Sequence, residues 1–243
     1  MKKIIVANWK MQLNYNDSLK LARSYKKNIK ETNNTIIVCP SHLFLIGVKK
    51  ILDGSSIVLG SQDCSIASIG AHTGDISARF LAELGVKYSI IGHSERRKYY
   101  HENGKIINDK IEVAMKNSII PILCIGESKK NRKKGEVKKF LRQQLREALK
   151  GIRLKCSRKL IVAYEPIWAI GGKKAIDPEE ANKIHEYIKE QVDKISGKRV
   201  KVLYGGSVNI NNAKLFLKEK NIDGLLIGGD SLYINDFSKI CQL

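Results

Sequence analysis

The chain has 243 residues and a formal net charge of +20, with 44 Lys and Arg against 24 Asp and Glu. Its length allows a large buried core and suits one α/β barrel or two smaller domains. No stretch approaches the ~18 apolar residues of a membrane span, and the first residues hold too few apolar side chains for a signal-peptide core, so we expect no membrane partner.

The basic residues are mostly lysines spread along the chain, with one dense patch at residues 127–139. We interpret this patch as solvated surface, because nucleic-acid-binding proteins concentrate arginine or interleave aromatic residues in a recognition element. We therefore expect no specific nucleic-acid partner, although a positive field speeds encounters with anionic substrates. The five cysteines are scattered without a C-x-x-C pair, which favours reduced thiols and a cytoplasmic location over disulfides or zinc.

Eight apolar, strand-like runs recur along the chain, separated by stretches with helical spacing. The runs occupy residues 4–7, 35–39, 57–60, 88–91, 119–125, 160–164, 200–204 and 224–227. Helical spacing is clear at residues 16–30, 104–117, 135–151, 178–195 and 209–220. Strands that alternate with helices predict a parallel sheet, and nearly continuous apolar strands predict burial on both faces.

Eight such units in this length match the α/β class with a single (β/α)8 barrel as one domain over residues 1–243. A doubly wound sheet stays open as an alternative, but its usual glycine fingerprint after the first strand is missing. No linker or change in composition marks a second domain.

In a (β/α)8 barrel the carboxyl ends of the strands meet at one mouth, where active sites form. The expected strand ends carry residues of complementary chemistry. They are Asn8 and Lys10 after the first strand, His93 after the fourth, Glu165 after the sixth, and glycine-rich turns at residues 205–207 and 228–229. Such a set is typical of proton abstraction beside the carbonyl of a phosphorylated substrate.

Glu165 is the candidate base, because Pro166 holds it at a rigid corner between strand and loop. Residues 167–172 are too apolar for an ordinary surface loop, and we expect them to form a lid that excludes water. His93 precedes S-E-R-R, an expected helix start with Ser94 as its cap, and a helix amino terminus disfavours an imidazolium. We therefore expect a neutral His93. A core strand with a chance glutamate is the plainer alternative.

The remaining candidates would bind the substrate. Asn8 and His93 can donate hydrogen bonds to a carbonyl oxygen that becomes an enediolate, and Lys10 supplies a fixed positive charge. The glycine-rich turns, expected at helix starts, can offer backbone N–H groups to a phosphate. Taken singly, His93 would more often be a core histidine and Lys10 a surface lysine.

Five motifs together resemble the triosephosphate isomerase family over the whole chain. They are N-W-K-M at 8–11, G-H-S-E-R-R at 92–97, A-Y-E-P-I-W-A-I-G at 163–171, Y-G-G-S-V at 204–208 and L-I-G-G at 226–229. The resemblance implies interconversion of dihydroxyacetone phosphate and D-glyceraldehyde 3-phosphate in glycolysis, gluconeogenesis and the pentose shunt, with no cofactor and no metal.

The resemblance also implies a role for each matching residue. Glu165 would be the base, His93 the electrophile, and Lys10 and Asn8 the substrate binders, while Glu95 would be a carboxylate near Lys10. Gly171, Ser207, Gly228 and Gly229 would hold the phosphate.

Family members are typically homodimers in which the loop after the third strand enters a pocket of the partner. Residues 62–76 lack a strand or helix pattern and resemble that loop, so Thr73 is expected near Asn8 and Lys10 of the partner subunit. Asp75 stands where the family usually has glutamate, which is expected to loosen an ion pair with Arg96 of the partner subunit. A floppy insertion is the alternative.

Three further positions depart from the family pattern. Gln12-Leu13 follows N-W-K-M in place of the usual Asn, and residues 172–176 differ from the usual far hinge of the lid. Asp230 follows the two glycines at 228–229 in place of alanine. An inward Asp230 would oppose a phosphate, whereas an outward one would cap the last helix, and we expect the cap.

Two other functions stay open on the residues alone. One is a different phosphate-binding barrel enzyme, such as a lyase or synthase. The other is a non-enzymatic basic barrel that binds polyanions.

Overall fold

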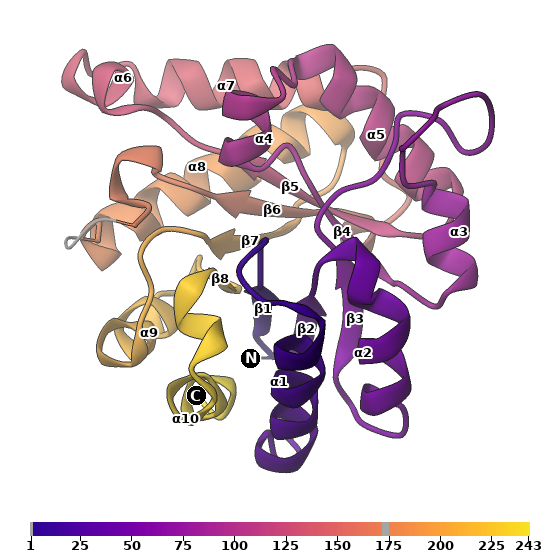
Figure 1. Cartoon of the computed structure of the whole chain (residues 1–243). Coiled ribbons are helices and arrows are strands. Elements are labelled where there is room, and N and C mark those ends of the chain that lie inside the picture. The colour runs from indigo at the N-terminus through magenta and orange to yellow at the C-terminus, as the bar shows by residue number, and fades with distance from the viewer. Residues whose placement is uncertain (1, 172–174) are drawn as a thin grey trace.

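Eight parallel strands close into a barrel with helices around it (Figure 1). The computed structural model describes residues 2–171 and 175–243. Neighbouring strands pair in chain order and β8 pairs with β1, so the sheet has no free edge. The strands are β1 (Ile4–Asn8), β2 (Thr35–Cys39), β3 (Val58–Ser61), β4 (Tyr88–Ile91), β5 (Ile120–Ile125), β6 (Ile161–Tyr164), β7 (Lys201–Tyr204) and β8 (Gly224–Ile227). The predicted (β/α)8 barrel is confirmed, and the doubly wound sheet is excluded.

Helices follow every strand. The α-helices are α1 (Tyr15–Asn28), α2 (Leu45–Leu52), α3 (Ala78–Glu83), α4 (Ser94–Tyr99), α5 (Gly104–Lys116), α6 (Lys129–Lys133), α7 (Val137–Ala148), α8 (Pro178–Ser196), α9 (Ile210–Lys218) and α10 (Ile234–Cys241). Short 3-10 helices are η1 (His42–Phe44), η2 (Ser157–Lys159), η3 (Ile167–Ala169) and η4 (Gly229–Leu232). In the described ranges, no helix is both long enough and apolar enough to cross a membrane.

Short polar side chains set where several helices begin. Asn14, Asn103 and Asp177 each accept a hydrogen bond from a backbone N–H in the first turn of α1, α5 and α8, respectively. These caps satisfy donors that have no partner inside the helix. One predicted helix has the wrong start: residues 135–151 were expected to be helical, but Gly135 has φ +67° and separates α6 from α7. Glycine adopts this left-handed conformation without the steric cost that a side chain imposes.

The core has two layers, because successive strand residues face opposite sides of the sheet. In β1, Ile4 and Val6 lie in the cluster that fills the barrel, while Ile5 and Ala7 belong to the cluster between strands and helices. All four are buried. This double burial explains why the strands read as nearly continuous apolar runs, and why the predicted runs match the observed strands to within one residue at each end.

Candidate active site

A cavity of about 270 Å³ lies at the carboxyl ends of the strands. The three residues expected to act in catalysis, Lys10, His93 and Glu165, all line it. The expected substrate-binding residues, Asn8, Gly171, Ser207, Gly228 and Gly229, line it as well. The fold therefore brings residues far apart in sequence around one cavity, as their positions at strand ends predicted.

Glu165 follows the last residue of β6 and is buried, with 2% of its surface exposed. Its backbone N–H donates to Ile125 O at 2.7 Å, which extends the ladder between β5 and β6. One carboxylate oxygen, Oε2, accepts from the Ser94 N–H at 3.1 Å, and Oε1 lies 3.2 Å from His93 Nε2. A Cβ on Gly126 would come within 1.6 Å of Glu165 O, so only glycine fits beside this backbone. The carboxylate is thus held on rigid elements, with its oxygens directed at the imidazole and the start of α4.

His93 caps α4, where Ser94 was expected to be the cap. The prediction failed by one residue, because the imidazole itself can accept the first-turn hydrogen bond: His93 Nδ1 accepts from the Glu95 N–H at 3.2 Å. A ring nitrogen that accepts a hydrogen bond carries no proton, so the neutral tautomer has its proton on Nε2. That nitrogen lies 3.2 Å from Glu165 Oε1, and both residues line the cavity. The arrangement favours a neutral imidazole that donates from Nε2.

Lys10 has a backbone φ of +51°, in the left-handed region that side chains rarely adopt. Two contacts hold it there: its N–H donates to Asn8 Oδ1 at 3.1 Å, and its carbonyl accepts from Gln62 Nε2 at 2.8 Å. Its ammonium pairs with Glu95 Oε1 at 2.6 Å, the neighbour that the resemblance implied. Strain held by surrounding contacts at a cavity is typical of preorganised sites. Gln62 was not singled out from the sequence for this contact.

The glycine-rich turns differ from expectation in their relation to helices. Residues 205–207 precede α9 by a short segment, and Asn209 is the cap of that helix. Gly228 is the N-cap of η4, which has only four residues. Gly171 has φ +67° and is exposed at the cavity. The expected far hinge of the lid at residues 172–176 falls largely outside the described residues, since 172–174 are not described.

Asp230 corrects another expectation, because it lines the cavity and does not cap the last helix. The N-cap of α10 is Tyr233, with no side-chain cap. Burial, and then the nearby Asp236, raise the pKa of the Asp230 carboxyl, while a hydrogen bond from its own backbone N–H opposes the shift. Gln12, the other departure near the first loop, also lines the cavity.

The sequence matches the family profile described as triosephosphate isomerase over residues 3–243. The chain belongs to the triosephosphate isomerase family. It is therefore an isomerase, and the family and fold class predicted from the motifs are confirmed.

Relatives of the same name match over nearly their whole length. Triosephosphate isomerase of Thermoanaerobacter pseudethanolicus is 38% identical over 241 residues, which cover 98% of this chain and 97% of that protein. The enzyme of Dehalococcoides mccartyi is 42% identical and covers 100% of this chain and 96% of that protein. A crystal structure of triosephosphate isomerase from Bartonella henselae superposes with a TM-score of 0.88 at 33% identity, over 99% of this chain and 98% of that one.

The 3-10 helix η3, where the expected lid begins, contacts a fully buried carboxylate, Glu127, just after β5. Its Oε1 accepts from Trp168 Nε1 at 2.8 Å and from the Tyr164 hydroxyl at 3.2 Å. Burial, and then the Glu127 charge, raise the pKa of Tyr164, so the hydroxyl keeps its proton and donates. Arg132 pairs with Glu127 at 3.2 Å and lies 4.5 Å above the Trp168 ring.

The interpretation of residues 127–139 as solvated surface is therefore wrong for Glu127 and Arg132. A signal for Glu127 was present, because it follows an apolar strand after a single glycine, and Glu165 likewise lies at the end of its strand. Arg132 gave no such signal, since it lies among lysines on a short helix.

Thr73 and Asp75 lie in an exposed loop, away from the cavity of their own chain. Residues 62–76 contain neither helix nor strand, as predicted. Asp75 accepts a hydrogen bond from Ser65 Oγ at 2.6 Å, and Arg96 pairs within the same chain with Asp63 at 2.8 Å. Both groups that were expected to meet across subunits therefore have partners within one chain.

Asp63 and Glu102 share two cations beneath this loop. Lys110 Nζ lies 2.6 Å from Asp63 Oδ2 and 2.5 Å from Glu102 Oε1, and Arg96 contacts both carboxylates. Burial raises the pKa of the Asp63 carboxyl to about 6, although Lys110 lowers it. This cluster ties the end of β3 to α4 and α5.

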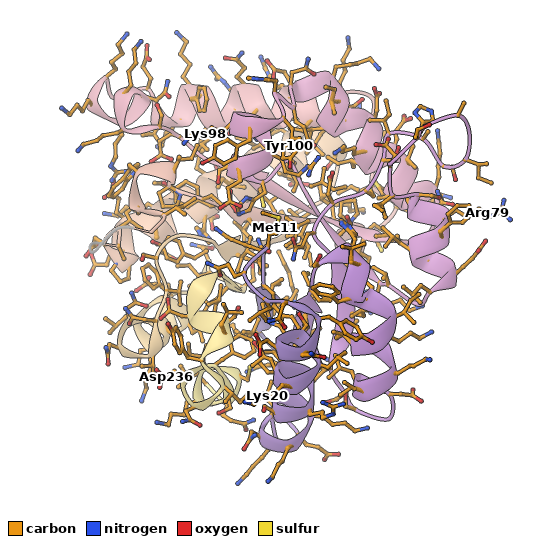
Figure 2. The ribbon with its side chains drawn as sticks, viewed as in Figure 1. Met11, Lys20, Arg79, Lys98, Tyr100 and Asp236 are labelled. Atoms are coloured by element: carbon orange, nitrogen blue, oxygen red, sulfur yellow. The ribbon has the colours of Figure 1, made fainter. Side chains whose placement is uncertain are left out.

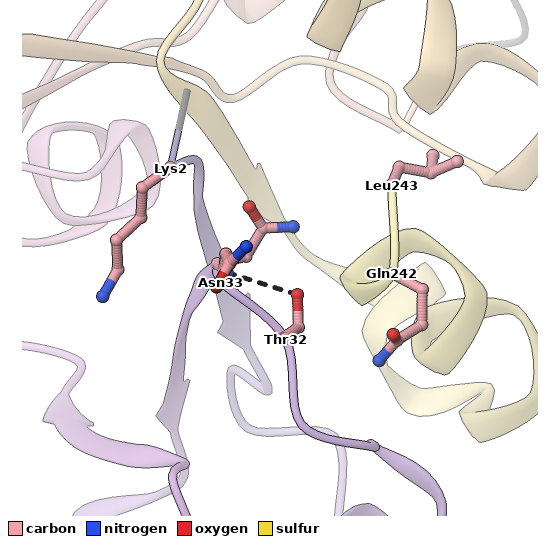
Figure 3. A pocket seen from close by; sticks show the side chains of 6 residues that line it. Lys2, Thr32, Asn33, Gln242 and Leu243 are labelled. Carbon is pink, nitrogen blue, oxygen red and sulfur yellow. Dashed lines mark hydrogen bonds between the residues drawn. The ribbon is translucent and has the colours of Figure 1, made fainter.

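A larger hollow of about 680 Å³ lies at the other end of the barrel (Figure 3). It is lined by Lys2, just before β1, and by Thr32 and Asn33, just before β2, so it opens at the amino ends of the strands. Among its lining residues there is no carboxylate or imidazole side chain. The smaller cavity at the carboxyl ends is therefore the candidate active site.

The described ranges hold no group of three or more His, Cys, Asp or Glu side chains placed to bind a metal ion. The five cysteines are all free thiols. Four of them are buried, and burial raises the pKa of Cys39 and Cys124, the two that lie inside the barrel.

Proposed function

We propose that this chain interconverts dihydroxyacetone phosphate and D-glyceraldehyde 3-phosphate through an enediolate, with Glu165 as the base and a neutral His93 as the electrophile. The observation that carries the proposal is the facing pair in one cavity: the buried Glu165 carboxylate and His93 Nε2 are 3.2 Å apart. Family membership supplies the reaction class.

The reaction needs a base and an acid that both reach one substrate. Glu165 takes a proton from the carbon beside the carbonyl, and the electron pair of that bond forms the enediolate. His93 gives its Nε2 proton to the carbonyl oxygen as that oxygen gains charge, and Lys10 adds a fixed positive charge next to it. His93 regains a proton from the hydroxyl on the carbon that Glu165 deprotonated, so this carbon becomes the new carbonyl, and Glu165 returns its proton to the former carbonyl carbon. No cofactor or metal is required.

The phosphate group would occupy the end of the cavity formed by Gly171, Ser207, Gly228 and Gly229. Backbone N–H groups in glycine-rich turns approach an anion closely, because no side chain intervenes. The lid that begins with η3 would then exclude water and keep the enediolate from losing phosphate.

We also propose that the active form is a cytoplasmic homodimer of single-domain chains, each a (β/α)8 barrel over residues 1–243. A second hollow of about 390 Å³ supports the dimer, since it lies beside Lys10 and is lined by Met11 and Tyr100. A loop of a partner subunit that entered this hollow would bring Thr73 close to Lys10 and Asn8. Limited proteolysis tests the single domain, because a shorter stable fragment would contradict it.

The direct test is a coupled assay with D-glyceraldehyde 3-phosphate and purified protein. Steady turnover to dihydroxyacetone phosphate supports the proposal. Turnover only of other phosphorylated substrates would favour a lyase or synthase, and absence of any turnover would favour the polyanion-binding barrel. A crystal soaked with a phosphate-bearing inhibitor would then locate the anion and the lid together.

A further inference from the structure

Asp230 places a carboxylate at the proposed phosphate end of the cavity. It follows Gly228 and Gly229 directly and lies in the first turn of η4. Its side chain lines the same cavity as Lys10 and Glu165. A charge in this position acts on whatever anion the glycine-rich turns bind.

No cation neutralises this carboxylate within the described ranges. The salt bridges of residues 2–171 and 175–243 include none to Asp230. Lys10, a cation that lines the cavity, pairs with Glu95 at 2.6 Å. Asp236 on α10, which is also acidic, acts electrostatically on Asp230, and Lys10, Glu165 and His93 line the same cavity.

A phosphate monoester carries nearly two negative charges near neutral pH. A like charge beside such a group opposes its binding, and solvent screens this repulsion only in part, because Asp230 is partly buried. This repulsion acts on binding of the phosphate and not on the proton transfer.

We propose that Asp230 sets the affinity of the cavity for phosphate groups by opposing the phosphate dianion with its carboxylate, which has no salt bridge to the residues that the structure describes. This inference depends on the proposed function, since it concerns the phosphate end of the same site. It makes Asp230 a specificity-determining residue: removal of its charge strengthens binding of the triose phosphate and of free inorganic phosphate.

The test compares Asp230→Asn, which keeps the shape and removes the charge, with the full-length wild-type chain. The inhibition constant of inorganic phosphate, KM and kcat are measured at about pH 8, where phosphate is doubly charged. We expect Asp230→Asn to lower the inhibition constant and KM by about fivefold to thirtyfold, with kcat changed by less than about twofold. A second variant, Asp230→Ser, serves if the first folds poorly by circular dichroism.

Asp236→Asn is the matched control, because it removes the same charge from the first turn of α10, outside the lining of the cavity. It should change each constant by less than about twofold. The inference is overturned if Asp230→Asn isomerises triose phosphate with an unchanged or higher inhibition constant for phosphate, or if Asp236→Asn has the same effect. If wild type does not isomerise triose phosphate at all, the proposed function fails instead, and phosphate binding measured by calorimetry still decides the role of Asp230.

Discussion

Glu165 is held in place by two neighbours that sequence spacing does not reveal. A Cβ on Gly126 would collide with its backbone, and a Cβ on Gly205 would lie 3.0 Å from its Cγ. The close approach of these two glycines restricts the positions that the Glu165 backbone and side chain can take beside the cavity. If the carboxylate lies even slightly farther from the substrate, kcat should therefore fall.

We predict that Glu165→Asp, which shortens the side chain by one methylene, lowers kcat by about 10²-fold or more with little change in KM. The reason is that the substrate still binds while the base no longer reaches the carbon-bound proton. Steady-state kinetics with glyceraldehyde 3-phosphate measure both constants. Glu112→Asp, the same change on the exposed face of α5, should leave kcat unaltered. An undiminished kcat in Glu165→Asp would remove Glu165 from the role of base.

His185 is a fully buried histidine on α8 whose ring lies edge-on to Tyr164, with the ring centroids 5.8 Å apart. Burial, and then the charge of Lys189, lower the pKa of His185 from 6.5 to about 3. The folded chain therefore keeps this ring neutral where the unfolded chain protonates it.

This difference makes stability depend on pH in one direction. Between about pH 6.5 and 3 the unfolded chain binds a proton that the folded chain does not, so the free energy of unfolding falls as the pH falls. From pH 6.5 to 5 the loss due to His185 is about 2 kcal/mol. We predict that His185→Leu removes this part of the loss, as measured by urea unfolding at both pH values. His101→Asn, a change of an exposed histidine, should keep the wild-type dependence. An equal slope in His185→Leu would contradict the assignment.

At the scale of elements, the lid is joined to the helix layer through Glu127. The first part of the lid, η3, is held by Trp168, and Arg132 connects Trp168 to α6 and to Glu180 on α8. A buried carboxylate with several donors is stable only while those donors stay in place. The rigid start of the lid thus depends on two helices that do not touch the cavity.

We predict that Trp168→Phe, which keeps a ring but removes the N–H, lowers the free energy of unfolding by about 1 kcal/mol. Because the lid then loses its anchor, kcat should fall severalfold. Urea unfolding and steady-state kinetics report the two effects separately. Tyr187→Phe also deletes one hydrogen bond, to Lys138 O on the surface, and should leave kcat as it is. If both variants behave alike, the lid does not depend on Glu127.

At the scale of the whole molecule, one side carries exposed apolar side chains that a monomer leaves in water. Met11 is 93% exposed and Tyr100 is 66% exposed, and both are labelled in Figure 2. They line the hollow beside Lys10, while the loop at residues 62–77 projects from the same chain. An exposed apolar set next to the active site is typical of an interface.

We predict that deletion of residues 70–72 together with Thr73→Ala yields a monomer of low activity. The loop would no longer reach the partner, so Lys10 and Asn8 would lose the support of the second chain. Sedimentation should give a mass near 27.3 kDa, the mass of one chain, and kcat should fall by about tenfold or more. Thr32→Ala, in the hollow at the opposite end of the barrel, should remain dimeric and active. A fully active dimer after the deletion would show that the loop has no such role.

Much of the barrel could be predicted because each strand is buried on both faces. Burial on both faces requires apolar residues at nearly every strand position, and such a run is visible in the sequence. The site residues could be predicted for a related reason, since Asn8, His93 and Glu165 each follow such a run. Glu127 follows one too and was passed over, because a lysine-rich stretch comes after it. Gln62, Gly126 and Arg132 act through neighbours from other strands and helices, and no local pattern marks those contacts.

The sequence by itself determined the eight strands, their parallel order and the family, because hydrophobic period and strand-end motifs are local properties of the chain. Only the tertiary structure decided that His93 and not Ser94 caps α4, that Glu127 anchors the lid, and that Asp230 faces the cavity. Each of these features depends on atoms from segments that are distant in sequence and lie close enough to form hydrogen bonds or interact electrostatically. Closure of the barrel sets those distances, and no local sequence pattern does.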